Sequence, residues 1–240
     1  MATHYCAHAD ISAFLQVSNF TGDTTPQSDA VEAFINMAEE RIDQLTDHAW
    51  HTSRAKAVTE ERGRIQRVTT NSVNDRGRIQ LRHYPILDMD NGTDKLHIWD
   101  GGNYVEYIAG KTGDDTITNI TGKDYWIDKE RGTIYLNSYN QFNLLSDAPS
   151  GVTAYVTYRY ATATTPADIK QATIYFASAM IAMNDDLNLM QEGDDSMDNS
   201  TKSQRFEEMA MKLLKDNRRL GRTMPTARAI GGFGARGVLP

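Results

Sequence analysis

Two segments with the pattern of an amphipathic helix, one starting at Thr25-Pro26 and one at Thr165-Pro166, enclose a long stretch with the pattern of β-strands. Proline suits the first helical position because its missing N–H is not needed there, and a threonine before it can cap the free N–H groups. We therefore predict helices that begin at Pro26 and Pro166, with Thr25 and Thr165 as N-caps. Helices at both ends with strands between them predict an α+β fold.

The first of these helices carries one apolar face. Its apolar residues recur at helical spacing: Val31, Phe34, Ile35, Ala38, Ile42, Leu45 and Ala49. Its charged residues fall mostly on the other faces: Glu32, Glu39, Glu40, Arg41 and Asp43. The pattern predicts a helix of about six turns that ends near Trp50. A shorter helix is expected over 10–17, with His4 and His8 in a mobile N-terminus.

Between Arg54 and Tyr160 the chain shows short runs of β-branched and aromatic residues. These runs predict strands over Arg64–Thr69, Arg78–Arg82, Lys95–Trp99, Tyr104–Ile108, Tyr125–Asp128, Thr133–Leu136 and Val152–Tyr160. Turn-forming residues separate them at Asn74–Gly77, Asp100–Asn103 and Lys129–Gly132. The spacing predicts antiparallel hairpins. The run RGRIQ occurs at both Arg62–Gln66 and Arg76–Gln80, an offset that suits adjacent strands of one hairpin.

The second helix is expected to end near Met183, with Asp168 stabilising its positive start. Residues 184–198 then hold six acids and no lysine or arginine, which predicts a solvated stretch. A last helix is expected over about 203–220. The final residues, 221–240, include five glycines, two prolines and three arginines but no acid, and this composition predicts an extended tail.

These patterns define four parts of the chain. Residues 1–53 and 164–220 form the two halves of a small helical bundle, residues 54–163 form an inserted antiparallel β module, and residues 221–240 form the extended C-terminal tail. The two helical ends are expected to pack together as one domain, because each leaves one apolar face to bury.

Composition and charge narrow the function classes. A net charge of −7 argues against a chain that coats nucleic acid electrostatically. Cys6 is the only cysteine, so no internal disulfide is possible. No apolar run approaches the roughly 18 residues of a membrane span, and the first residues do not form a signal peptide. We expect a protein made in the cytosol, without a membrane segment.

Motifs for chemistry are weak, and each has a simpler structural interpretation. Gly232–Gly237 matches GxGxxG, but the chain ends three residues later, where a dinucleotide site would need a helix. His48 and His51 share one helix face but lack further zinc ligands, so a polar helix end is favoured. Asp88, Asp90 and Asp94 surround Asn91-Gly92 without the spacing of an EF-hand, so a hairpin turn is favoured.

Further candidates for metal binding or modification are weaker still. The acids Asp194, Asp195 and Asp198 are interpreted as a solvated face. Four Asn-x-Ser/Thr sequons, at Asn19, Asn91, Asn119 and Asn199, would need a secretory route. We therefore expect no catalytic residue, no metal and no cofactor, and a chain that is not an enzyme.

Several segments, taken in order, carry a family resemblance. They are Ala38–Trp50 at the end of the first helix, Tyr84–Leu87, Tyr125–Asp128 with Arg131–Leu136, and Val156–Tyr160 followed by Pro166–Ala172. Over about residues 8–183 this layout resembles the head–tail connector, or adaptor, proteins of tailed viruses, which have a small helical bundle, often with a β insertion in this place.

The resemblance implies a structural role in the virion neck. Such proteins form a ring, typically of about twelve copies, beneath the portal, and the next tail or neck protein follows. DNA passes through the channel without specific binding, and assembly takes place in the host cytoplasm. A C-terminal extension commonly docks on the portal, which here would involve Arg218, Arg219, Arg222, Arg228, Phe233 and Arg236.

Two other functions remain open from the sequence. A tail-completion or tail-terminator ring would contact the tail tube instead of the portal. A β-rich module that binds a ligand such as a carbohydrate would use an aromatic platform of Trp99, Tyr104, Tyr107, Tyr125 and Trp126. A packed β-sandwich core explains the same aromatic residues more simply.

Overall fold

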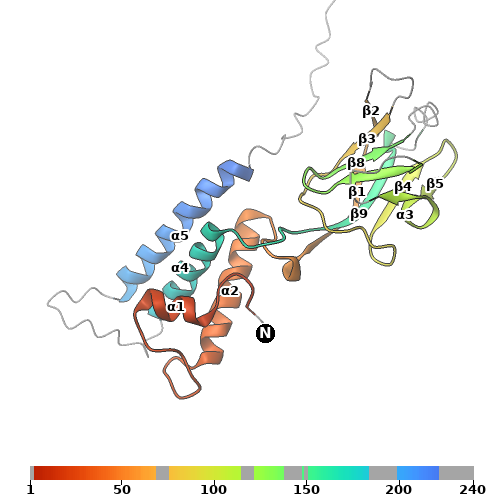
Figure 1. Cartoon of the computed structure of the whole chain (residues 1–240). Helices are drawn as coiled ribbons and strands as arrows, with labels where there is room; N and C mark the ends of the chain where they lie inside the picture. The colour runs from red at the N-terminus through yellow and green to blue at the C-terminus, as the bar shows by residue number, and fades with distance from the viewer. Residues whose placement is uncertain are drawn as a thin grey trace, which may run out of the picture. The chain divides into compact units, whose positions relative to one another are not determined.

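A computed structural model describes residues 3–68, 76–114, 122–137, 148, 151–183 and 199–221. The chain forms two compact units (Figure 1). The helical unit consists of residues 1–46 together with the residues from 167 onward, and the β unit consists of Asp47–Pro166. Helices in one unit and two largely antiparallel sheets in the other confirm the α+β fold.

The helical unit is organised around its most apolar helix. It contains α1 (His8–Leu15), α2 (Ser28–Thr46), α4 (Ala167–Met183) and α5 (Asn199–Gly221). Helix α4 packs against each of the other three. It is buried on most of its surface, including Ile169, Phe176 and Ile181, and this is the expected position for a helix that is apolar nearly all round.

Both helix starts differ from the prediction. Helix α2 begins at Ser28, after a cis Thr25–Pro26 peptide, and Thr24 rather than Thr25 hydrogen-bonds the entering backbone. Helix α4 begins at Ala167, and the Thr165 hydroxyl donates to the Trp50 carbonyl 3.1 Å away instead of capping the helix. Proline therefore marks the approach to each helix rather than its first residue.

Of three other bounds of the helices, one agrees with the prediction and two differ from it by four residues. Helix α2 stops at Thr46, four residues before the expected Trp50, because Asp47 adopts a left-handed conformation with φ 52°. Helix α4 ends at Met183 as predicted. Helix α5 starts at Asn199, four residues earlier than expected, and includes Arg218 and Arg219.

Two sheets make up the β unit. The four-stranded sheet has the order β1 (Lys56–Gly63), β9 (Ala154–Tyr160), β4 (Lys95–Trp99), β5 (Tyr104–Glu106), and all its pairs are antiparallel. The five-stranded sheet has the order β2 (Gln66–Val68), β3 (Arg76–Gln80), β8 (Thr133–Leu136), β7 (Tyr125–Asp128), β6 (Gly113–Asp114). Its β6–β7 pair is parallel, an exception to the predicted antiparallel module. Two short helices complete the unit, η1 (Thr52–Arg54) and α3 (Tyr107–Gly110).

Strands with strict alternation or full burial lie where the sequence predicts them. β4, β7 and β8 have the expected bounds, and the turns at Asp100–Asn103 and Lys129–Gly132 join β4 to β5 and β7 to β8. Tyr107 and Ile108, predicted as strand, belong to α3, because the Glu106 carboxylate accepts from the Ile108 N–H at 3.0 Å and caps a helical turn.

The repeated RGRIQ run is split by the fold. The second copy is strand β3, whereas the first copy spans the end of β1 and the start of β2. β2 and β3 do pair antiparallel, with Gln66 opposite Arg78, so the two copies meet as predicted over part of their length. The turn expected at Asn74–Gly77 lies partly outside the described residues.

One apolar cluster joins the facing surfaces of the two sheets. It includes Leu96, Val156 and Tyr158 from the four-stranded sheet and Ile79 and Ile134 from the five-stranded sheet. Alternate residues of each strand therefore point into this cluster, and the residues between them lie on the outer faces. The β unit is a small sandwich whose outer faces carry polar and aromatic side chains.

Candidate partner-binding surfaces

The six residues expected to dock on a portal lie at the end of the described chain or beyond it. Arg218 and Arg219 belong to the last turns of α5, where only the backbone is described. Arg222, Arg228, Phe233 and Arg236 lie outside the described residues. The candidate GxGxxG run at Gly232–Gly237 and the acids Asp194, Asp195 and Asp198 also lie outside them.

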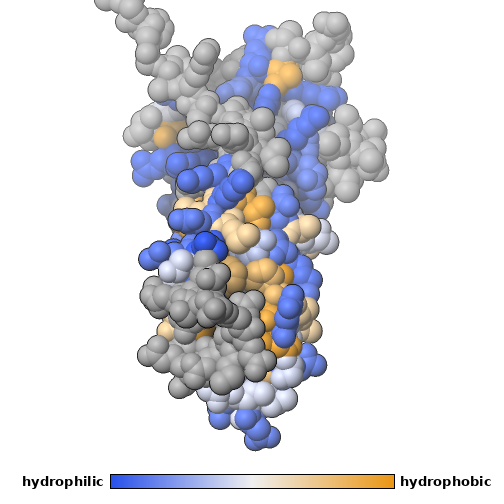
Figure 2. All heavy atoms as spheres, turned by 90° about the vertical axis from the view of Figure 1, so that its left-hand side faces the viewer, coloured by the Kyte–Doolittle hydropathy of each residue, from blue (hydrophilic) through white to orange (hydrophobic). Residues whose placement is uncertain are grey.

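Helix α5 leads to these residues and exposes a mixed surface. A hollow of about 470 Å³ runs along it, lined by Gln204, Glu207, Glu208, Met211, Lys212 and Lys215. Met209 on α5 and Met37 on α2 are about half exposed, which is unusual for large apolar side chains. The face of the molecule shown in Figure 2 has hydrophobic residues among hydrophilic ones. A surface of this kind suits a contact with another protein.

Arg41 connects three helices of the helical unit. Its Nη1 lies 2.8 Å from Glu207 Oε1 of α5, and its guanidinium lies 4.5 Å from the ring centre of Phe176 on α4. A second connection is aromatic, because Phe14 of α1 packs edge-on against both Tyr175 and Phe206. Together these contacts position α5 against the other helices.

The N-terminal residues are fixed to α2 by two buried carboxylates. Glu39, fully buried, accepts from the backbone N–H of His4 at 2.6 Å and of Tyr5 at 2.7 Å. The Tyr5 hydroxyl donates to Asp43. The expectation that His4 lies in a mobile N-terminus is therefore wrong, and Glu39 and Asp43, which were placed mostly on faces other than the apolar one, are buried. The N-terminal amides supply the hydrogen bonds that make burial of both acids tolerable.

Cys6 follows directly in this anchored segment. The thiol is buried, and burial together with the negative charge of Glu39 raises its pKa to about 12. A thiol with this pKa carries almost no thiolate at neutral pH and reacts slowly. Cys6 can therefore report on release of the N-terminal segment.

Two chain segments at the start and end of the β unit, residues 47–50 and 160–165, form what we call the stem. The Thr162 N–H donates to the Ala49 carbonyl at 2.9 Å, and His48 Nε2 lies 2.8 Å from Thr162 Oγ1. His48 packs edge-on against Trp50. His51 instead accepts from the Ser53 N–H through Nδ1. Each histidine of the HxxH pair thus holds local backbone or stem structure, and neither lies on α2.

We expect the β unit to lose stability as pH falls from about 6.5 to about 4. Burial lowers the pKa of His48 from 6.5 to about 4, so the unfolded chain binds a proton that the folded chain does not. That difference corresponds to about 3 kcal/mol of unfolding free energy, present above pH 6.5 and lost toward pH 4. Urea unfolding across this range measures it. In the variant His48→Gln, the unfolding free energy should depend less on pH between 4 and 6.5. An unchanged pH dependence would mean that His48 is not the group responsible.

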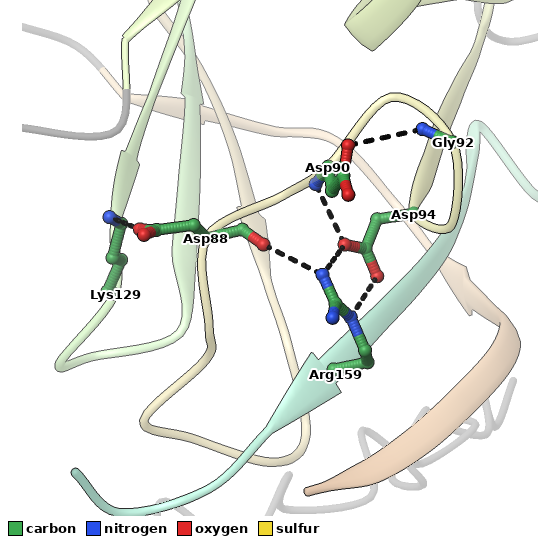
Figure 3. Close-up of polar contacts among 6 residues, drawn as sticks. All are labelled: Asp88, Asp90, Gly92, Asp94, Lys129 and Arg159. Atoms are coloured by element: carbon green, nitrogen blue, oxygen red, sulfur yellow. Dashed lines mark hydrogen bonds and ion pairs between the residues drawn. The ribbon is translucent and has the colours of Figure 1, made fainter. Parts of the chain in front are cut away.

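The aspartates that resemble a calcium loop form a turn and two ion pairs (Figure 3). Asp94, 2% exposed, accepts from Arg159 Nη2 at 2.9 Å and from the Asp90 N–H at 2.8 Å. The Asp90 carboxylate accepts from the Gly92 N–H, and Asp88 pairs with Lys129. The Asp90–Asp94 turn leads into β4 and does not join paired strands, so the predicted hairpin is wrong although the turn is present.

Within the described ranges, no group of three or more His, Cys, Asp or Glu side chains is placed to hold a metal ion. Of the four sequons, Asn19 accepts a hydrogen bond from Ser12 Oγ at 3.2 Å, Asn91 lies in the Asp90–Asp94 turn, Asn199 begins α5, and Asn119 lies outside the described residues.

The five aromatic residues proposed as a ligand platform do not share one exposed face. Tyr107, Tyr125 and Trp126 are each less than a tenth exposed, and the first two belong to the core. Trp99 and Tyr104 remain near the surface, where their ring centres lie 5.1 Å apart and Tyr155 packs beside Tyr104. The packed sandwich therefore accounts for most of this set.

Comparisons with known proteins add little. No protein-family model matches this chain, and no curated protein matches it. Among solved structures, a chain described as "Neck of empty GTA particle computed with C6 symmetry" matches with a TM-score of 0.40 and 15% identity, over 86% of this chain and 92% of that chain. A TM-score this low does not establish a shared fold, and the neck and its symmetry are stated of that particle alone.

The described helices were also compared with the requirements of a membrane span. None of them combines the length and the apolar composition needed to cross a bilayer.

Proposed function

We propose that this chain is a structural protein of a virion neck, a head–tail connector that forms a ring between the portal and the tail. In this role it joins two larger assemblies and leaves a channel for DNA. Its C-terminal residues, from Arg218 to Pro240, dock on the portal, and the β unit is available to a neighbouring copy or to the next neck or tail protein.

One observation carries the proposal. The two ends of the chain build a single helical unit around α4, and the β unit is inserted between α2 and α4. This is the chain order that the resemblance to head–tail connectors implies. The last described helix, α5, belongs to this unit, and the arginine-bearing C-terminal residues follow it in the sequence.

The mechanism of docking follows from composition. Residues 222–240 contain three arginines and no acid. An arginine-bearing segment gains bidentate contacts with carboxylates on a partner, and these contacts offset the conformational freedom that the segment loses on docking. Like charge between a negatively charged ring and DNA keeps the DNA from adhering to the channel.

We expect deletion of Arg222–Pro240 to abolish ring formation on a portal while leaving the fold intact. The deleted residues follow α5 and include none of the described core. Native mass spectrometry of the chain with and without the portal ring measures assembly, and thermal unfolding measures the fold. The Phe233→Ala variant of the full chain serves as a milder version of the same change.

Two results would contradict the proposal. A large loss of thermal stability on deletion would place these residues in the core rather than at a partner. Failure of the full chain to join the portal, with binding to a tail tube instead, would favour the tail-completion or tail-terminator alternative.

A further inference from the structure

The outer face of the five-stranded sheet carries two arginines over an aromatic pair. We call this the arginine face and define it by Arg76, Arg78, Trp126 and Tyr135. Arg78 lies opposite Tyr135, and Tyr135 lies opposite Trp126, so the three side chains share one face of the sheet. Arg76, two residues from Arg78 on β3, lies on the same face.

This face is opposite to the core. Gly77, between the two arginines, is buried, and a Cβ added to it would lie 2.8 Å from Ile65 Cγ2 and 3.2 Å from the Leu136 side chain. Ile79, the next alternate residue, is fully buried in the apolar cluster. Since alternate residues of a strand point to opposite faces, Arg76 and Arg78 point away from the cluster.

The aromatic pair holds the first guanidinium in a fixed place. Trp126 and Tyr135 stack with ring centres 5.5 Å apart and an interplanar angle of 13°. The Arg76 guanidinium lies 4.9 Å from the Trp126 ring centre. A guanidinium over a ring is attracted by the π face and keeps its N–H donors available at its edge. The Arg76 side chain therefore loses little further conformational freedom when it binds an acceptor.

Arg78 has a donor that lacks an acceptor. Its Nη2 donates to Gln80 Oε1 at 2.6 Å. Its Nε is buried and meets no hydrogen-bond acceptor in the part of the chain that the structure describes. Neither Arg76 nor Arg78 lies within ion-pair distance of a carboxylate among the described residues. Both arginines are half-buried, so their guanidinium groups can meet an acceptor from a partner, although the buried Nε of Arg78 cannot.

The charge pattern of the same chain supplies that acceptor. Residues 54–82, which include β1, β2 and β3, hold eight lysines and arginines against three acids. Residues 184–198 hold six acids and no lysine or arginine. Carboxylates are the natural partners of guanidinium groups, because two N–H···O bonds can form at once. Each copy therefore brings a basic stretch of chain that includes both arginines of the face, and one acidic segment.

We propose that the arginine face binds the acidic segment, residues 184–198, of a neighbouring copy. This inference rests on the proposed ring, in which every copy must present two different and complementary surfaces. DNA is the less favoured occupant, since a chain of net charge −7 repels a polyanion, whereas the acidic segment is present once for every arginine face.

A peptide assay tests the contact directly. The receptor is the full chain with the six acids of residues 184–198 changed to Asn or Gln, which removes competition from its own segment. The probe is a fluorescent peptide of sequence NDDLNLMQEGDDSMD, and fluorescence anisotropy reports binding. We expect salt-sensitive binding that weakens by roughly tenfold or more in the receptor that also carries Arg76→Glu and Arg78→Glu. A peptide with lysines in place of its acids should bind this reversed receptor again, which shows that the receptor is folded.

Lys95→Glu with Lys111→Glu is the matched control for this assay. Both lysines are exposed in the β unit, and the pair changes the net charge by the same amount. The control should leave peptide binding nearly unchanged. If peptide binding weakens equally in the lysine control and in the Arg76→Glu, Arg78→Glu receptor, only net charge matters and the proposal is overturned. The proposal is also overturned if the acidic peptide binds the Arg76→Glu, Arg78→Glu receptor as tightly as it binds the receptor with both arginines. A DNA oligonucleotide that binds the face when the acidic peptide does not would assign the face to nucleic acid.

A mixing experiment decides whether the contact joins two copies. One chain carries Arg76→Glu and Arg78→Glu, and the other carries Asp194→Lys, Asp195→Lys and Asp198→Lys. Neither chain alone should assemble on a portal ring, whereas their mixture should, because each face then meets a segment of opposite charge. No assembly in the mixture, with the peptide still binding, would place the contact within one copy. If the unmodified chain does not join the portal either, the proposed function fails independently of this contact.

Discussion

Replacing Glu39 with alanine should lower the free energy of unfolding of the helical unit by about 4 kcal/mol. The fully buried carboxylate accepts from the backbone N–H groups of His4 and Tyr5. Without it, two amides lose charge-assisted hydrogen bonds, of which the Tyr5 bond is buried and the His4 bond is partly buried. The N-terminal segment must then either remain with unpaired amides or leave α2 and expose Tyr5, and both outcomes cost stability.

Urea unfolding measures this loss, and the native thiol gives a second readout. Cys6 should react slowly with a thiol reagent in the unmodified chain, because burial raises its pKa to about 12. In Glu39→Ala we expect labelling to become faster by roughly tenfold or more, as the segment leaves α2 more often. Glu40→Ala, which removes the neighbouring exposed acid, is the control for both measurements. Unchanged labelling in Glu39→Ala would show that the amides do not depend on this carboxylate.

The second large effect is expected at Asp94 in the β unit. Asp94→Ala should cost about 3 kcal/mol, because it removes the buried acceptor of Arg159 and of the Asp90 N–H. The side chain of Arg159 is about a third exposed and can regain some water, which keeps the cost below that of a fully buried pair.

Thermal and urea unfolding of three variants separates the causes. Asp94→Asn retains a hydrogen-bond acceptor but removes the charge. Its loss of unfolding free energy should therefore be smaller than that of Asp94→Ala but larger than zero. Asp90→Ala removes an exposed carboxylate whose described contact is the Gly92 N–H at 3.4 Å, and it should change stability by less than about 0.5 kcal/mol. Equal losses at Asp90 and Asp94 would mean that the turn, not the ion pair, stabilises this region.

Strands and helices were predictable where one physical pattern dominated. β4, β7 and β8 follow from alternation or from complete burial, and α4 follows from its long apolar run. Strand β1 was missed because it reads KAVTEERG, with few apolar residues. It lies at a sheet edge and is interrupted between Val58 and Glu61, where Glu60 has φ 54°. An edge strand does not need the alternation by which strands are recognised.

The polar features were less predictable because their partners are distant in sequence. Glu39 and Asp43 were expected mostly away from the apolar face of the helix, and the return of Tyr5 onto α2 gives both acids buried hydrogen-bond partners. The Asp94–Arg159 pair joins residues 65 positions apart. The arginines of β3 were visible as part of the RGRIQ repeat, but the aromatic pair beside them depends on the register of β8 and β7.

The stem has a consequence for how such a protein can change over evolution. Its two segments connect the β unit to α2 and α4 and are held to each other by the Thr162–Ala49 and Thr165–Trp50 hydrogen bonds. For the helices, the whole insertion is thus equivalent to a short connection with fixed ends, and its length contributes little to their loop-closure entropy. The β unit can therefore be enlarged, exchanged or trimmed to suit a new neighbour without redesign of the helices that carry it.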